Sequence, residues 1–390
     1  MVKLIEFAMC GSEGKECNPY VLTAHLERQK LLLLINSKPL SAGDIARELG
    51  ISTEEVIKHL YELARCGLVK EVNGLYRPAF AIFTLGDQRT LQPLMDDLAN
   101  DIVEVIKDNM RRVRDVINDL SIVKRGIKPD DLEYVIVGAI TLDYSGLDVL
   151  SEEGLLLKSK KMPGGGNYVF TGFEVGLIDL NEAWMWGHNG VFGKYWFSSH
   201  GKLPPRGRLA FPDLAWLWYG LGVSLDKVTA KMSEIGAILE ALTYGDLTFK
   251  DLQSKLGINE LSLATDLSLL LTLWYVTVLN RKLWRLNIPV FTPEDYGRVK
   301  TLSISILKEI ASRFKSKLSI INDYYSKTSP ARNEIPLKEA FNQVYHIIFE
   351  KALDKLIKDE VIKEPPLRPD GGRYSVFMII LKEAKSPFTY

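Results

Sequence analysis

The chain has 390 residues, a length typical of two or three domains, and its composition is that of a soluble globular protein. Lys plus Arg and Asp plus Glu number 49 each, which excludes a global electrostatic attraction to nucleic acid or to an anionic membrane. Three cysteines are too few for a disulfide framework or a four-ligand zinc site, and the N-terminus lacks the features of a signal peptide. We therefore expect a cytoplasmic protein with no metal, cofactor or membrane contact.

The first 85 residues predict three helices followed by two strands. Cys10 and Cys17 precede these elements and either form a disulfide or remain thiols. Ser52 is placed to cap the third helix, with Glu55 at the capping-box spacing, and Asn73-Gly74 is a strong hairpin signal. The predicted elements are helices over 28–37 and 40–49, a helix after Ser52, and strands over 69–72 and 75–82.

This order of elements is that of a winged helix. The stretch "LSAGDIARELGISTEEVIKHLYELARCGLV", followed by the "NG" turn, resembles the ArsR-like winged-helix proteins of archaea. The resemblance covers residues 28–85 and implies a helix-turn-helix in which the third helix is the recognition helix. It allows a DNA-binding transcription regulator, but winged helices also dock on proteins and bind RNA.

The recognition helix has a balanced charge. If Val56, Leu60, Leu63 and Ala64 face the core, then Glu54, Lys58, Tyr61, Glu62 and Arg65 face outward. Residues 1–85 contain ten basic and ten acidic side chains, whereas DNA contacts favour Lys, Arg, Asn and Gln. This face predicts a poor reader of base edges. The alternative DNA contacts are Lys58, Arg65, Lys70 and Arg77.

The chain repeats itself at an offset of about 207 residues. "LSAGDIARELGIS" aligns with "LTFKDLQSKLGIN", so that Leu40 falls on Leu247 and Asp44 on Asp251. Farther along, the glycine-rich "PGGGNY" aligns with "PDGGRY". The sequence therefore predicts an α+β, mainly α fold: an internally duplicated tandem winged-helix protein with long amphipathic helices and an aromatic-rich central insertion.

The repeat predicts the following division of the chain. An N-terminal extension (1–27) precedes the first winged helix (28–87), a long helix (88–128) and a helix-plus-hairpin unit (129–175). The aromatic-rich insertion (176–230) is followed by a degenerate second winged helix (231–295), a long helix (296–330) and a second helix-plus-hairpin unit (331–390).

The second winged helix and the insertion differ from the first copy. From Leu256 to Asn280 there is no Lys or Arg, so this copy cannot read DNA. The insertion holds five of the seven Trp residues, which we expect to form a local core. His188 and His200 have no carboxylate or Cys at a metal-binding spacing, so we expect structural histidines and no catalytic residues.

Local cationic clusters are the remaining candidates for nucleic-acid contact. Lysine-rich loops beside exposed aromatics such as Tyr168 suit contacts to an RNA backbone. The glycines Gly164, Gly165 and Gly166 would let that backbone approach closely. The predicted contacts are Lys158, Lys160, Lys161, Arg111, Arg112, Arg114, Lys202, Arg206, Arg208, Arg281 and Lys282.

An apolar stripe with spacings of three and four marks the first long helix and predicts a homodimer through paired helices. It consists of Leu91, Met95, Leu98, Ile102, Ile106, Met110, Val113, Ile117 and Leu120. The alternative is that the two repeated long helices pack on each other within one chain. Zero net charge, the two acids that open the recognition helix and the apolar second copy favour a non-enzymatic adaptor that docks on ribosomal RNA and ribosomal proteins. The chain is more loosely similar to archaeal ribosome dimerisation or hibernation factors, which implies translation regulation; a DNA-binding regulator is the alternative.

Overall fold

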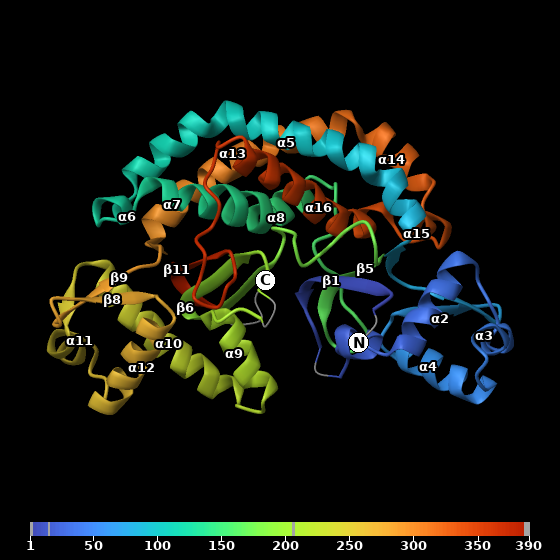
Figure 1. The fold of residues 1–390 in the computed structure, drawn as a ribbon, viewed down its shortest axis with the longest axis horizontal. Helices are drawn as coiled ribbons and strands as arrows, with labels where there is room; N and C mark the ends of the chain where they lie inside the picture. Colours follow the sequence, from blue (N-terminus) through green and yellow to red (C-terminus); the bar gives the residue numbers. More distant parts are fainter. Residues whose placement is uncertain (1–2, 15, 205–206, 386–390) are drawn as a thin grey trace. The chain divides into compact units, whose positions relative to one another are not determined.

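A computed structural model describes residues 3–14, 16–204 and 207–385. Its contacts divide the chain into two compact units, each built from segments that are distant in sequence (Figure 1). The first comprises Met1–Ile102, Gly146–Leu180 and Leu307–Ala352; the second comprises Val103–Ser145, Asn181–Ile306 and Leu353–Tyr390. The fold is α+β and mainly α, as predicted.

The first winged helix lies in the first unit and follows the predicted order. Its elements are α2 (Leu26–Ser37), α3 (Ala42–Leu49), α4 (Thr53–Arg65), β2 (Val69–Val72) and β3 (Leu75–Pro78). Gly50 ends α3 in the left-handed region at φ 68°, and Asn73 and Gly74 form the wing turn at φ 54° and 77°. These positive φ values explain why Gly and Asn stand at these turns.

The predicted strand over 75–82 is divided between two sheets. β3 pairs with β2 in the wing, whereas β4 (Ala81–Phe83) runs parallel to β5 (Asn167–Glu174) in a three-stranded sheet. The other neighbour of β5 is β1 (Ile5–Ser12), which is followed by the short helix α1 (Pro19–Thr23). Residues 1–27, expected to be an extension, thus contribute a strand and a helix to the first unit.

Helices complete the first unit. They are α8 (Gly146–Glu152), α14 (Leu318–Ser326), α15 (Ser329–Arg332), and parts of α5 (Leu85–Asp119), α13 (Pro293–Ser316) and α16 (Leu337–Lys358). Lys317, the residue after α13, contacts the middle of α5: its ammonium lies 2.6 Å from a carboxylate oxygen of Asp101. The buried carboxylate of Asp87 accepts a hydrogen bond from the backbone N–H of Ser329, at the N-terminus of α15.

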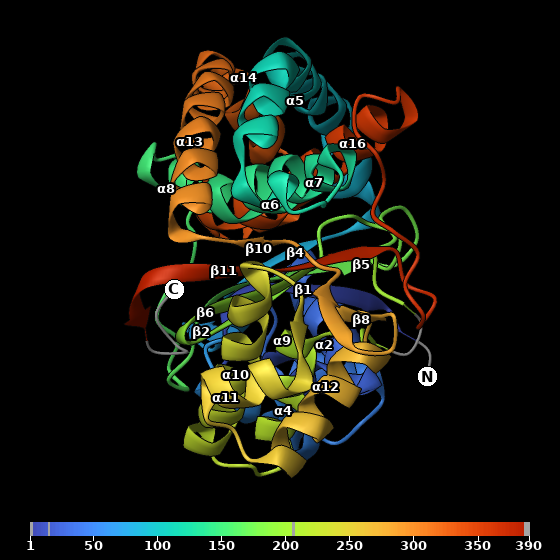
Figure 2. The ribbon, with the colours of Figure 1, turned by 90° about the vertical axis from the view of Figure 1, so that its left-hand side faces the viewer.

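The second unit repeats this plan. Its strands are β6 (Gly187–Gly201), β7 (Leu247–Thr248), β8 (Val276–Leu279), β9 (Leu283–Leu286), β10 (Val290–Phe291) and β11 (Tyr374–Lys385). Its helices are α6 (Ser121–Lys124), α7 (Pro129–Tyr134), the π-helix η1 (Val135–Ser145), α9 (Phe211–Gly220), α10 (Leu225–Thr243), α11 (Phe249–Leu256) and α12 (Glu260–Thr272), with the remaining parts of α5, α13 and α16. The order β10-β11-β6 matches β4-β5-β1 (Figure 2).

The sequence offers no counterpart for residues 176–230, whereas the structure does. β6 lies antiparallel to β11 as β1 lies antiparallel to β5, and Gly201 faces Tyr374 as Gly11 faces Tyr168. Both glycines have positive φ, and a Cβ on either would meet the backbone of the facing tyrosine at under 3.0 Å. The duplication therefore extends to the strand that precedes each winged helix.

The equivalence also holds for a buried carboxylate. Asp295, on α13, accepts hydrogen bonds from the backbone N–H and the hydroxyl of Ser121 at 2.9 and 2.5 Å. This repeats, in the second unit, the contact of Asp87 with Ser329. Each repeat therefore caps a short helix that follows the long helix of the other repeat.

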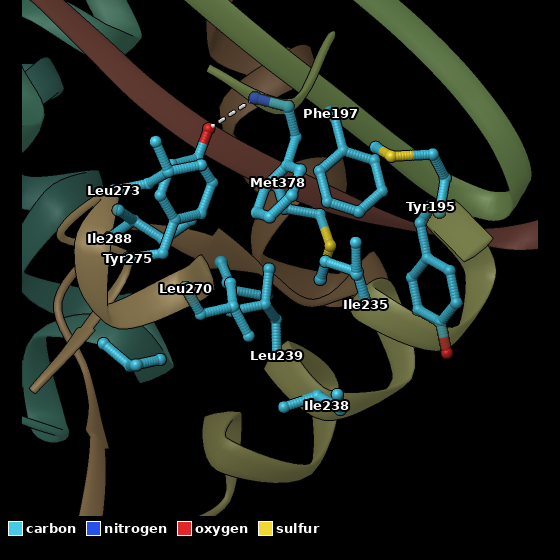
Figure 3. Close-up of a cluster of buried hydrophobic side chains, with 14 of the residues drawn as sticks. Tyr195, Phe197, Ile235, Ile238, Leu239, Leu270, Leu273, Tyr275, Ile288 and Met378 are labelled. Atoms are coloured by element: carbon cyan, nitrogen blue, oxygen red, sulfur yellow. Dashed lines mark hydrogen bonds between the residues drawn. The ribbon is translucent and has the colours of Figure 1, made fainter. Parts of the chain in front are cut away.

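Apolar side chains from several segments form each core. In the second unit, residues of α10, α12 and β11, including Leu239, Leu270 and Met378, meet in one cluster (Figure 3). The helix Pro129–Glu152 is long and apolar enough to cross a membrane, but 83% of its most apolar window is buried inside the protein, as in the core helix of a soluble protein. Its burial accounts for its composition.

The stripe predicted to join two chains is buried within one chain. All nine of its residues, from Leu91 to Leu120, are at most 5% exposed. Within each unit, α5 and α13 exchange polar contacts, including Arg112 to the Ser305 hydroxyl at 3.0 Å in the second. The dimer surface predicted on α5 is therefore wrong, because this apolar face is covered by the protein itself.

Candidate nucleic-acid interface

Helix α4 presents a mixed face to solvent. Val56, Leu60 and Leu63 are buried as predicted, whereas Ala64 is exposed because it lies at the edge of the apolar arc. The residues named here as the α4 outward face are Glu54, Lys58, Tyr61 and Arg65, which follow one another at spacings of three and four and are all exposed. Tyr61 has the largest exposed ring on α4, with 64% of its surface accessible.

The acids at the start of α4 have a local function. The hydroxyl of Ser52 accepts a hydrogen bond from the backbone N–H of Glu55 at 3.2 Å, which satisfies one of the free donors of the first turn. Carboxylates in the first turn also interact favourably with the helix dipole. At the other end, Arg65 lies 3.0 Å from Glu62, and this hydrogen bond raises the pKa of the arginine. Lys58 is exposed.

The cations of the wing are paired within the first unit. The guanidinium of Arg77 lies 2.8 Å from the carboxylate of Glu334, and the ammonium of Lys70 lies 4.0 Å from the same carboxylate. The hydrogen bond from Arg77 lowers the pKa of Glu334. Lys70 and Arg77 are therefore not available as phosphate contacts unless these pairs break. Of the predicted DNA contacts, Lys58 and Arg65 remain on the exposed face of α4, and the ion pair of Arg65 with Glu62 on the same helix would also have to break for a phosphate contact.

A disulfide fixes the end of the recognition helix. Cys66, at the C-cap of α4, is bonded to Cys17, with a Cα–Cα distance of 5.8 Å. The Cys10–Cys17 disulfide considered above is therefore wrong. A Cβ on Gly164 would lie 2.4 Å from Cβ of Cys17, so the glycine-rich tip packs on the protein's own disulfide. The predicted close approach at this tip is to the chain itself.

The lysines beside this tip are largely engaged. Lys158 forms an ion pair with Asp148, and Lys160 with the buried carboxylate of Glu339, all within the first unit. Lys161 is exposed, but Tyr168 is 1% exposed and cannot stack on a base. The description of Tyr168 as an exposed aromatic is wrong, because its ring lies in the core between the sheet and the first winged helix.

The predicted arginine strip on α5 belongs to the second unit. Arg111 is exposed, Arg112 bonds the hydroxyl of Ser305, and Arg114 lies 2.8 Å from the carboxylate of Glu133. These three arginines therefore belong to a different unit from Lys158, Lys160 and Lys161.

The other predicted contacts that the structure describes belong to the second unit. Lys202 lies 4.6 Å from the Trp184 ring centroid, and Arg206 lies outside the described residues. Arg281 and Lys282 are exposed at the second wing.

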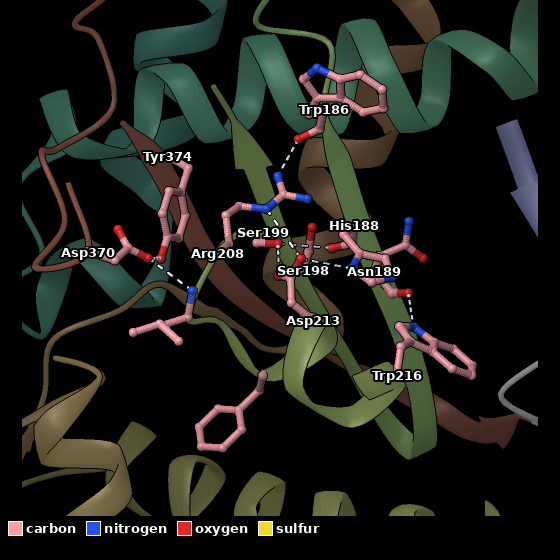
Figure 4. Close-up of polar contacts among 12 residues, drawn as sticks. Trp186, His188, Asn189, Ser198, Ser199, Arg208, Asp213, Trp216, Asp370 and Tyr374 are labelled. Atoms are coloured by element: carbon pink, nitrogen blue, oxygen red, sulfur yellow. Dashed lines mark hydrogen bonds and ion pairs between the residues drawn. The ribbon is translucent and has the colours of Figure 1, made fainter. Parts of the chain in front are cut away.

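Arg208 is a core residue rather than a phosphate contact. It is 7% exposed and donates to the backbone carbonyl of Trp186 at 2.6 Å. Asp213 accepts hydrogen bonds from His188 and Ser199, both at 2.9 Å (Figure 4). Burial raises the pKa of Asp213, but these hydrogen bonds and the charge of Arg208 hold it below its ordinary value.

His200 is held in the same way. Its Nδ1 lies 2.9 Å from the Tyr134 hydroxyl and its Nε2 lies 3.1 Å from the carboxylate of Asp143, in a fully buried environment. Burial, with the charge of Asp143, raises the pKa of Tyr134 far above its usual range. Both histidines therefore have carboxylate partners that sequence spacing could not reveal, and both hold β6 to neighbouring helices. Among the described residues, no group of three or more His, Cys, Asp or Glu side chains could hold a metal.

The second winged helix exposes a different surface. At the offset of 207 residues, the α4 outward face corresponds to Leu261, Thr265, Ser268 and Thr272, which are also exposed. We name these four residues the α12 outward face. It has no charged residue, whereas the α4 outward face has three.

Comparison with known proteins identifies part of the chain. The family described as "Bacterial regulatory protein, arsR family" matches residues 27–71, which span α2, α3, α4 and most of β2. No curated protein and no solved structure matches the chain. An ArsR-type helix-turn-helix is therefore present in the first unit.

Proposed function

We propose that this protein is a non-enzymatic, cytoplasmic DNA-binding regulator that contacts DNA through the first winged helix alone. The observation that carries the proposal is the ArsR-type segment, whose recognition helix has an exposed outward face with Lys58, Tyr61 and Arg65. Lysine and arginine suit phosphates and guanine edges, and glutamate can accept from a cytosine amino group. The uncharged α12 outward face offers none of these contacts.

The few available cations limit the affinity. Lys70 and Arg77 are paired with Glu334, and α4 supplies only Lys58 and Arg65, of which Arg65 is paired with Glu62. We therefore expect binding to random duplex no tighter than about 10⁻⁵ M at physiological salt. Specific binding then depends on base contacts from the α4 outward face and on sequence-dependent DNA shape.

The charge balance of α4 favours a second candidate, an adaptor that docks on a ribonucleoprotein, with the ribosome or its small subunit as the best choice. Ile57 and Tyr61 are 52% and 64% exposed on the same helix, and apolar and aromatic side chains of this kind favour a protein surface. In this function, the exposed side chains of Lys161, Arg111, Arg281 and Lys282 are among the predicted RNA contacts.

Fractionation of a native lysate separates the two candidates. The lysate is divided, treated with DNase or with RNase, and sedimented through a gradient, and the protein is followed by immunoblot. The DNA-binding proposal expects co-sedimentation with DNA that DNase abolishes and RNase leaves unchanged. Co-sedimentation with ribosomal subunits that resists DNase would contradict it and support the adaptor.

A further inference from the structure

The turn after α6 has a glycine where the equivalent turn of the other repeat, after α15, has a glutamate. At an offset of 208 residues, Gly126 corresponds to Glu334. The N–H of Gly126 donates to the carbonyl of Val123 at 3.0 Å, and the N–H of Glu334 makes the matching bond to Ala331 at 3.0 Å. Both residues also have positive φ, 103° and 61°. The two turns are therefore equivalent in backbone and differ in this side chain.

In the first unit, Glu334 places a carboxylate beside the wing. This carboxylate pairs with Arg77 on β3 at 2.8 Å. In the second unit, Arg285 on β9 takes the place of Arg77, because it holds the same position in its wing hairpin. A Cβ on Gly126 would meet no atom within 4 Å, so there is open space where a side chain would begin. The second unit thus keeps the arginine of this pair and lacks the glutamate.

A pocket lies beside this turn in the second unit. It is lined by four apolar residues, Ile122, Ile127, Leu242 and Leu286, and by the arginines Arg125 and Arg285. All six belong to the second unit. The pocket has a volume of about 50 Å³, several times the space that one buried water needs, and it is partly open to solvent. Its size suits a ligand of a few heavy atoms that has both an apolar and a polar part.

The two arginines have N–H donors to spare. Arg125 donates from Nη1 to the carbonyl of Thr243 and from Nη2 to the hydroxyl of Ser121. Arg285 donates from Nε and Nη2 to the carboxylate of Asp246 at 2.6 to 3.1 Å. A guanidinium has five N–H groups, so each arginine keeps donors that have no acceptor within the described part of the chain. Both oxygens of Asp246, in contrast, already accept from Arg285, so the unused capacity of the pocket suits an acceptor.

The charge of Arg125 is only partly compensated. The nearest carboxylate oxygen of Asp295 lies 3.9 Å from Nη2 of Arg125, beyond hydrogen-bonding distance, and Asp295 accepts instead from Ser121. Burial lowers the pKa of Arg125, and the charges of Asp295 and Tyr244 offset this lowering only in part. At the equivalent position the first unit has the uncharged Asn333. An anion beside Arg125 would therefore be stabilised.

We propose that this pocket binds a short aliphatic carboxylate, whose charged end replaces the carboxylate that Glu334 supplies in the first unit. The ligand accepts hydrogen bonds from Arg125 and Arg285, because guanidinium groups match the planar geometry of a carboxylate. Its aliphatic chain lies against the four apolar residues of the pocket. Inorganic phosphate would also satisfy the arginines, but it would gain nothing from the apolar wall. The proposal is independent of DNA binding.

Saturation-transfer NMR on the full chain, in a buffer without carboxylates, tests the proposal with butyrate as the probe. Because so small a ligand gains little binding energy, we expect a dissociation constant on the order of 1 mM. Butylammonium has the same chain with the opposite charge and should bind at least about tenfold more weakly. Inorganic phosphate, added as a competitor at the concentration of butyrate, should leave most of the butyrate signal in place.

Two substitutions at Gly126 form a matched pair. Gly126→Glu gives this turn the carboxylate of the first unit and should weaken butyrate binding at least about tenfold, since it competes for the arginines. Gly126→Ala places a Cβ at the same positive φ without a carboxylate, and should bind butyrate like the wild type. Arg125→Met removes one guanidinium and should also weaken binding. It serves as the second variant if Gly126→Glu does not give the wild-type circular dichroism spectrum.

The proposal would be overturned if the wild-type chain bound no butyrate at about 10 mM, well above the expected dissociation constant. Equal binding of butyrate and butylammonium, or loss of most of the butyrate signal to an equal concentration of phosphate, would also overturn it. The same holds if folded Gly126→Glu and Arg125→Met bind butyrate like the wild type, or if Gly126→Ala loses as much binding as Gly126→Glu.

Discussion

The recognition helices α4 and α12 share a backbone plan and differ in what they expose. Both follow a short helix that ends at a left-handed glycine, Gly50 or Gly257, and both bury a leucine stripe against their winged helix. Outside that stripe, α4 has charges and a tyrosine, whereas α12 has hydroxyls and leucine. The fold constrains the inner face, so the outer face of each copy was free to acquire a separate function.

The largest expected effect is the loss of stability on truncating the buried leucines that α4 and α12 have in common. Leu60→Ala and Leu267→Ala truncate equivalent side chains that are 2% and 0% exposed, and each should lower the free energy of unfolding by about 2–5 kcal/mol. Chemical denaturation followed by circular dichroism measures both. If only one of the pair destabilised the protein, the inner faces would not be equivalent.

The disulfide is present at one helix only. Cys66 closes a loop of 49 residues with Cys17, whereas the equivalent position after α12 is Leu273, buried without a cross-link. Because a cross-link reduces the entropy of the unfolded chain, Cys17→Ser with Cys66→Ser should lower stability by about 2–4 kcal/mol.

The same double variant distinguishes the two winged helices. Hydrogen exchange, read by mass spectrometry, should increase in α4 and leave α12 unchanged. Equal increases in both helices would show that the disulfide does not act locally on α4.

The cations of α4 provide the functional contrast. Lys58→Ala with Arg65→Ala should weaken DNA binding about tenfold or more and flatten the salt dependence by about two units, since each neutralised phosphate adds about one. Thr265→Ala with Thr272→Ala, the equivalent pair on α12, should leave affinity and slope unchanged. Fluorescence anisotropy titrations at several salt concentrations give both quantities. An equal loss from the α12 pair would remove the functional distinction.

A smaller effect is expected on the pH dependence of stability, which differs between the buried sides of α4 and α12. Burial, together with a hydrogen bond to Glu234, raises the pKa of Asp266 to about 6. The folded state therefore binds this proton more tightly than the unfolded chain, and its contribution to stability is present at low pH and lost as the pH rises to about 6. Burial alone would raise the pKa of Glu234, but hydrogen bonds from Asp266, Lys231 and Ser262 lower it to about 2, which confines its effect to below pH 4.5.

Asp266→Asn isolates this contribution. Relative to the wild type, the variant should lose about 1 kcal/mol of pH dependence between about pH 4.5 and 6, measured by denaturation at each pH. The equivalent residue on α4 is His59, whose pKa is lowered by burial and by Arg28, so its contribution is lost as the pH falls. A His59→Gln variant should therefore change the pH dependence in the opposite direction. If both variants changed the pH dependence of stability in the same direction, the opposite pKa shifts of Asp266 and His59 would be contradicted.

Local features of this fold could be predicted from the sequence. The caps at Ser52 and Gly50, the Asn73-Gly74 turn and the apolar period of α4 depend on neighbouring residues, and the structure confirms them. The 207-residue offset also identified the second winged helix, because its core leucines keep the spacing of the first.

Long-range pairings could not be predicted in this way. Glu334 pairs with Arg77 across more than 250 residues, and nothing near either position signals it. The Cys17–Cys66 bond depends on folding, which brings the segment before α1 to the end of α4. The partners of His200, Tyr134 and Asp143, lie on α7 and η1. Sequence spacing therefore overestimated the number of free cations, because it could not show which of them already had carboxylate partners.

Selection from a pool of random duplex DNA tests the central claim most directly. The wild-type chain is used at about 0.15 M salt in parallel with two variants, Lys58→Ala/Arg65→Ala and Thr265→Ala/Thr272→Ala. The account predicts that the wild type and the α12 variant enrich the same sequence motif and that the α4 variant does not. Enrichment of no motif by the wild type, or of the same motif by the α4 variant, would contradict the account.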